Sequence, residues 1–90
     1  MSILETKQKY LSNIEHTRNN QLAIEQQYFE RLEQLNSALQ IAPNPAYSRE
    51  VMEIEIYHLP KIQAEITRLT LELQEAQHEV NKWTPKPVTE

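Results

Sequence analysis

The segment that decides the fold is LPKIQAEITRLTLELQEAQHEV, residues 59–80. Apolar side chains recur along it with alternating spacings of three and four residues. This spacing places them on one side of a helix and is typical of a helix that packs lengthwise against another in a coiled coil. The segment therefore predicts a helix whose seam consists of Leu59, Ile62, Ile66, Leu69, Leu73, Ala76 and Val80.

Directly upstream, VMEIEIYH (residues 51–58) has two interpretations. Apolar residues and glutamates alternate from Met52 to Ile56 as in a half-buried strand, but the chain offers no second strand, and a lone strand is unstable. We therefore predict a helix with a kink near Pro60, because proline inside a helix costs about 3 kcal/mol. The alternative is an extended arm that ends at about residue 58.

The same segment leaves apolar side chains without a place in a simple hairpin. Extending the seam spacing backwards from Leu59 puts Glu55 and Met52 on the seam, so the other apolar residues point in nearly all directions. A hairpin covers one side only, and contiguous exposed apolar surface usually marks a contact site. The residues predicted to form a partner or self-association surface are Met52, Ile54, Ile56, Tyr57, Leu71 and Trp83.

Further towards the N-terminus, IAPNPAYS (residues 41–48) interrupts the helical pattern. Pro43 disfavours helix at the residue before it, and Asn44 followed by proline is typical of a helix N-cap. The segment predicts a turn over residues 42–47 between two antiparallel helices. The second of these helices is expected over about 48–82.

The first helix is predicted over about residues 3–41, which contain neither proline nor glycine. At about 1.5 Å per residue, such a helix forms a rod roughly 58 Å long. An apolar stripe with helical spacing runs along it. The side chains expected to face the second helix from its end near the turn are Phe29, Leu32, Leu35 and Leu39.

Polar residues interrupt both seams. Arg18 and Glu25 lie on or near the seam of the first helix, and Arg68 and Glu72 lie beside the second. With the turn centred near residue 44, Arg18 is expected to pair with Glu72, and Glu25 with Arg68. Polar seam residues of this kind contribute little stability but can fix the register of two helices.

The composition favours an all-α fold. The chain has 90 residues, enough for one small unit, and contains no glycine, cysteine or aspartate. A β-rich fold needs tight turns that glycine usually supplies. We therefore predict one helical hairpin with coiled-coil packing over residues 1–82, which dimerises into a four-helix arrangement. A flexible proline-containing tail is expected over residues 83–90.

Charge and residue usage exclude several classes of function. The net charge is −4 and the nine basic residues are scattered, so binding to nucleic acid is not expected. Without cysteine, disulfides and cysteine-ligated zinc are impossible. No apolar run has the length of a signal peptide or a membrane span, so we expect a cytoplasmic protein without a membrane span.

Candidate catalytic or metal-ligating groups are few. Two Glu-x-x-His pairs occur, Glu55 with His58 and Glu75 with His78, a motif that di-iron helical bundles use. In one helix the two pairs lie about 30 Å apart, so we interpret them as solvated surface residues and predict no metal. There is no glycine-rich phosphate loop and no recognisable triad, and a two-helix rod offers no pocket. We predict neither an enzyme nor a cofactor, and no small-molecule substrate.

These observations predict a protein–protein interaction module, such as a small adaptor, assembly factor or scaffold component, that packs against itself or another helical protein. The alternative starts from APNP (residues 42–45) between two long helices. This plan resembles the helical-hairpin chaperones and needle subunits of type III secretion, although their proline–polar–polar–proline turn is one residue longer than Pro43-Asn44-Pro45. The resemblance implies a secretion chaperone or export-apparatus subunit that holds a partner helix. A nucleic-acid regulator acting as a helical dimer is the least favoured class.

Overall fold

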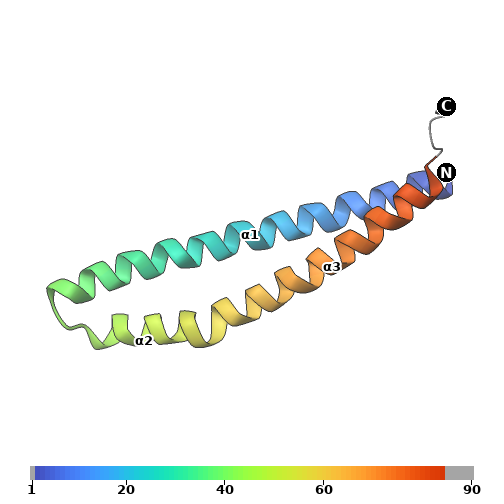
Figure 1. Cartoon of the computed structure of the whole chain (residues 1–90). Helices are drawn as coiled ribbons and strands as arrows, with labels where there is room; N and C mark the ends of the chain where they lie inside the picture. Colours follow the sequence, from blue (N-terminus) through green and yellow to red (C-terminus); the bar gives the residue numbers. More distant parts are fainter. Residues whose placement is uncertain (1, 85–90) are drawn as a thin grey trace, which may run out of the picture.

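A computed structural model describes residues 2–84 and shows a helical hairpin (Figure 1). Within these residues there is no strand, which confirms the predicted all-α class. The elements in chain order are α1 (Ile3–Ile41), α2 (Pro45–Glu53), the π-helical turn η1 (Ile54–His58) and α3 (Leu59–Trp83). The last three follow one another without a break and form a second arm antiparallel to α1. The rod measures 68 × 25 × 17 Å.

The ends of α1 are set by local hydrogen bonds. Ser2 is the N-cap, and its hydroxyl oxygen accepts a hydrogen bond from the backbone N–H of Glu5 at 3.1 Å. At the other end Ala42 is extended, as expected for a residue before proline. Its N–H donates to the carbonyl of Ala38 at 3.2 Å. The helix therefore has the predicted bounds of residues 3–41.

The second arm begins earlier than predicted. The side-chain oxygen of Asn44 accepts hydrogen bonds from the N–H groups of Ala46 and Tyr47, at 3.1 and 3.2 Å. Pro45 is the first residue of α2, where its missing N–H has no cost. The helix thus starts three residues before the predicted residue 48, because Asn44 provides the cap.

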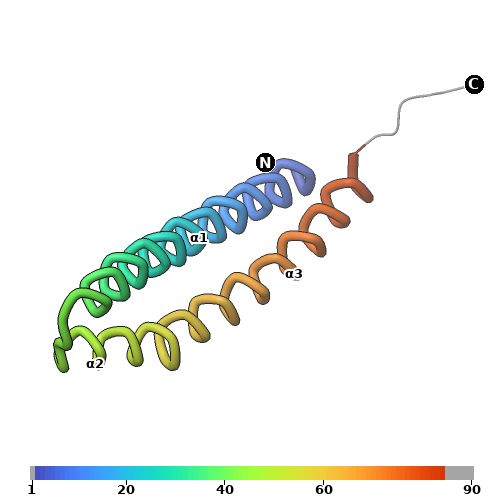
Figure 2. The backbone as a smooth tube through the Cα atoms, turned by 60° about the vertical axis from the view of Figure 1, so that its left-hand side comes forward, coloured from blue at the N-terminus to red at the C-terminus, as the bar shows by residue number. Residues whose placement is uncertain are grey.

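Residues 51–58 are helical throughout, so the strand and the extended arm are both wrong. In η1 the N–H of Leu59 donates to the carbonyl of Ile54, five residues earlier. The arm changes direction around this turn, drawn in yellow in Figures 1 and 2. Pro60 has no N–H to donate, and in a regular α-helix its ring would clash with the carbonyl four residues earlier. The wider π-helical turn before Pro60 is therefore favoured over a regular α-helical turn.

The interior of the hairpin consists of two apolar clusters with a polar stretch between them. One cluster, towards the termini, is built on Ile14, Leu69 and Ala76, with Leu11 and Leu73 packed against it. The other, towards the turn, is built on Leu35, Ile54 and Leu59, with Tyr28, Leu32, Tyr47 and Val51 packed against it. The half-buried side chains of α1 between the clusters include Arg18, Gln21 and Glu25.

The predicted seam of the second arm lies between the arms, since its residues from Leu59 to Val80 are all buried or half-buried. On α1, the prediction is wrong for Phe29, whose side chain is 43% exposed. Tyr28 faces the second arm instead and stacks on His58, with ring centroids 5.2 Å apart. Tyr28 and Phe29 are adjacent in the sequence. A shift of one residue in the position of the seam on α1 therefore decides which of the two packs inside.

Ile54 needs the opposite correction. It was predicted on the outer surface, but it is 2% exposed and belongs to the cluster near the turn. Because of the π turn, the spacing from Ile54 to Leu59 on the seam is five residues, instead of three or four. This extra residue moves the seam positions before it by one residue. Val51 and Ile54 therefore face α1, in place of Met52 and Glu55.

Candidate helix–helix interface

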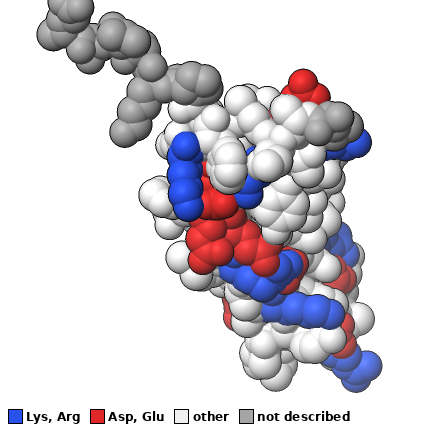
Figure 3. Space-filling view, turned by 90° about the vertical axis from the view of Figure 1, so that its right-hand side faces the viewer, with Lys and Arg blue, Asp and Glu red and all other residues white. Residues whose placement is uncertain are grey.

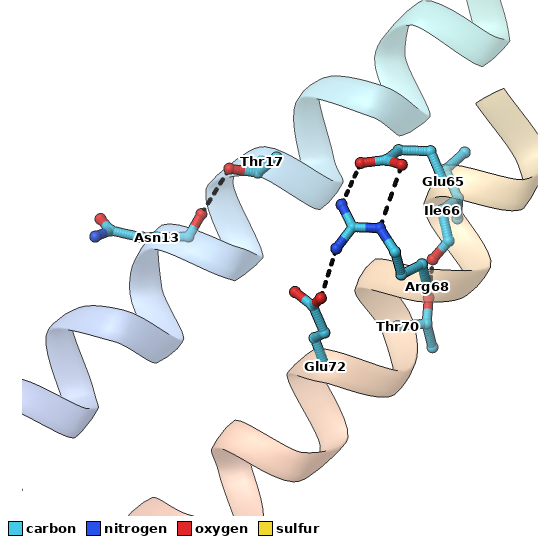
Figure 4. A network of polar contacts seen from close by, with 7 residues as sticks. All are labelled: Asn13, Thr17, Glu65, Ile66, Arg68, Thr70 and Glu72. Carbon is cyan, nitrogen blue, oxygen red and sulfur yellow. Dashed lines mark hydrogen bonds and ion pairs between the residues drawn. The ribbon is translucent and has the colours of Figure 1, made fainter. Parts of the chain in front are cut away.

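The polar contacts between the arms differ from the predicted register pairs. The Nε of Arg18 donates to the hydroxyl oxygen of Thr70 at 2.8 Å and does not reach Glu72. Arg68 bonds within its own helix, to Glu65 and Glu72, as Figure 4 shows. Arg68 therefore does not meet Glu25. An arginine and a glutamate four residues apart lie on the same helix face and can pair within the helix. Arg68 therefore bonds in α3 and makes no pair with α1.

Two ion pairs do join the arms. Lys7 Nζ lies 2.9 Å from a carboxylate oxygen of Glu79, and Arg31 Nε lies 2.6 Å from one of Glu50. The hydrogen bonds from these cations lower the pKa of both glutamates below the usual value. A view of the end of the rod near the termini shows acidic side chains set among basic ones, without a continuous basic face (Figure 3).

Acidification is expected to weaken the hairpin through these glutamates. Because their pKa values are lowered in the folded state, they stabilise it above the unfolded-state pKa of about 4.3, and the stabilisation is lost as the pH falls further. Both pairs are at least partly exposed to solvent, so the expected loss in Tm between pH 7 and pH 3 is small. Thermal melts of the chain and of an E50Q/E79Q variant test this, since the variant should lose part of the pH dependence. An identical pH dependence would contradict the role of the pairs.

The residues predicted to form a partner surface do not all lie in one place on the structure. Met52, Ile56 and Leu71 are exposed on the side of the second arm that faces away from α1. Tyr57 is also exposed, but a cation lies close to its ring, with Lys61 Nζ 5.6 Å from the ring centroid. Trp83 is 46% exposed at the end of the arm, with Lys7 Nζ 6.0 Å from its ring.

The exposed side of the second arm carries a continuous stripe without charge, called the outer stripe below. Its residues are spaced by four, four, four, three and four, and each is exposed. Spacings of three and four keep side chains on one helix face, and the wider π turn lets the four-residue spacing continue through it. The outer stripe consists of Met52, Ile56, Pro60, Ala64, Thr67 and Leu71.

Sequence reasoning missed the middle of the outer stripe. Pro60 and Ala64 are small or rigid, and Thr67 is polar, so none of them marks a contact by itself. In the structure the Thr67 hydroxyl donates to the carbonyl of Gln63 at 3.0 Å, which satisfies it within the helix and leaves its methyl group available for contact. The absence of charge at helical spacing is the signal that could have revealed these residues.

A shallow groove with a charged lining lies between α1 and α3. It has a volume of about 410 Å³ near the termini, and Lys7, Tyr10, Glu72, Glu75 and Glu79 are among its lining residues. No three histidine or acidic side chains are arranged to hold a metal ion in the part of the chain that the structure describes. The two Glu-x-x-His pairs are therefore not gathered into a common site.

Comparison with protein-family models, curated proteins and solved structures finds no match to the chain. Within residues 2–84, no helix combines the length and the apolar character needed to cross a membrane.

Proposed function

We propose that the protein is a non-enzymatic helix–helix interaction module, an adaptor or scaffold component that binds through the outer face of its second arm. The observation that carries this proposal is the outer stripe. An apolar side chain such as Ile56, which is 70% exposed, is removed from water only when another surface covers it, and that burial is favourable.

The hairpin supports this role by holding the outer stripe on a preformed helix. Packing of the seam against α1 fixes the second arm on one side only, so the opposite face stays available. Binding to a preformed helix avoids the entropic cost of folding on contact. Coiled-coil packing between the arms belongs to the same proposal, because it makes the presenting helix straight and stiff on either side of η1.

The proposal is tested by photo-crosslinking in cells that produce the protein. A photoreactive amino acid at Ile56 or Thr67 is expected to form covalent adducts with a protein, because both positions lie on the outer stripe. The same amino acid at Lys9, exposed on α1, is the matched control and should form few adducts. Adding L71E to the Ile56 and Thr67 probes should reduce their adducts. Equal adduct formation at all three positions, or none on the outer stripe, would refute the function.

A further inference from the structure

The order of side-chain sizes along most of the outer stripe, from Ile56 to Leu71, is symmetric about one residue. Ala64 is at the centre, Pro60 and Thr67 flank it, and the larger Ile56 and Leu71 lie beyond them. This part of the stripe therefore reads the same in both directions by size: large, small, smallest, small, large. Met52, the first residue of the stripe, lies outside the symmetric part. A surface with this order is complementary to an antiparallel copy of itself.

We infer that the outer stripe is the interface with a second copy of this chain, packed antiparallel about a two-fold axis at Ala64. In such an interface each contact occurs twice. Ile56 of one copy packs against Leu71 of the other, and Pro60 packs against Thr67. At the axis Ala64 meets its own counterpart, and the small side chain lets the two helices approach closely.

The absence of charge on the outer stripe favours a second copy over a charged partner. A basic or acidic helix would find no counter-charge on the outer stripe, whereas between Ile56 and Leu71 a second copy brings no unpaired charge to it. The net charge of −4 on each copy opposes association. At the ends of the interface Glu53 of one copy comes near Glu75 of the other. Salt is therefore expected to strengthen the dimer, because it screens this repulsion.

The length of the outer stripe limits the strength of the dimer. From Ile56 to Leu71 the contact spans 16 residues, or about 24 Å of helix. Two helices touching over this length bury less than about 1,000 Å² in total, in the range of weak or transient interfaces. The dimer is therefore expected to form in the micromolar range and to exchange with the monomer.

The test is the solution mass of the full-length protein, measured by sedimentation over a range of micromolar concentrations. The wild-type chain is expected to shift from monomer to dimer as its concentration rises. A64E places two like charges at the axis and should weaken the dimer at least about tenfold. A23E, an alanine exposed on α1, is the matched control and should leave the dimer unchanged. Unchanged circular dichroism would show that both variants fold.

Disulfide trapping reports the geometry independently, because the described residues contain no cysteine. The Ala64→Cys variant should form a disulfide between two copies on oxidation, since equivalent residues at a two-fold axis lie within disulfide reach. The Tyr57→Cys variant, altered at an exposed residue off the outer stripe, should not. A wild-type chain that stays monomeric, or a dimer that A64E leaves intact, would overturn the inference.

The inference rests on the proposed function, but the two can fail separately. Adducts of the outer stripe with the mass of two chains support both. Adducts with a different protein, together with a monomeric wild-type chain, would retain the function and overturn the second copy as the occupant.

Discussion

Deletion of Glu65 is expected to abolish the cooperative melting of the half of the hairpin near the termini, whereas deletion of Glu55 is tolerated. Glu65 lies inside α3, so its loss turns all later seam residues by about 100° away from α1. Among them are Leu69, Ala76 and Val80, all buried. Burial of a large apolar side chain contributes about 1.5–3 kcal/mol, and the combined loss is comparable to the whole stability of a small protein.

Glu55 lies in η1, where the seam has one residue more than a regular helix needs. Its deletion reduces the interval from Ile54 to Leu59 to four residues, so both remain on the seam. The deletion is best made together with P60A, because proline would oppose the regular helix that results. Both deletions in the P60A background form a matched pair, compared by thermal melting followed by circular dichroism. Similar Tm values for the two would show that the π turn is not an insertion in the seam.

The second large effect is expected at Leu35, which is 1% exposed and packs with Ile54 and Leu59 on both sides of the π turn. Leu35→Ala should destabilise the hairpin by about 3 kcal/mol, because it removes apolar contacts and leaves a cavity between two helices that cannot close it. For a chain of this size this corresponds to a fall in Tm of roughly 12–24 °C.

The control for Leu35→Ala is Ile41→Ala in the same helix. Ile41 is 89% exposed, so its replacement should change the unfolding free energy by less than about 0.5 kcal/mol. Both values come from urea unfolding at one protein concentration, which matters if the chain self-associates. A Leu35→Ala effect as small as that of Ile41→Ala would mean that the cluster near the turn contributes little.

Much of the fold follows from spacing and breakers in the sequence. The heptads from Leu59 to Val80, the proline-rich turn and the absence of glycine lead to a hairpin, and the bounds of α1 agree with the structure. What local patterns did not reveal is the change of phase at η1. A prediction that extends one regular helical spacing backwards from Leu59 ignores the extra residue in η1. It therefore places the seam one residue too late, on Met52 instead of Val51 and on Glu55 instead of Ile54.

The candidate surface was predictable only in part for the same reason. Met52, Ile56 and Leu71 were identified as apolar residues in excess of what a hairpin covers. Their common face becomes visible only when the π turn is known, because that turn brings Met52 and Ile56 into line with Pro60 and Leu71. Phe29 shows a second limit: neighbouring aromatic residues compete for one seam position, and the stacking of Tyr28 on His58 resolves the choice.

The division of the interior into two clusters has a mechanical consequence. The start of α1 and the end of α3 lie at the same end of the rod (Figure 1). Tension applied between these ends therefore separates the arms from that end, one helical turn after another, and does not shear the whole seam at once. The cluster around Ile14 opens first, and the polar stretch near Arg18 and Glu25 offers little resistance. The cluster around Leu35 then holds the remaining hairpin closed, so the molecule yields to force in two stages.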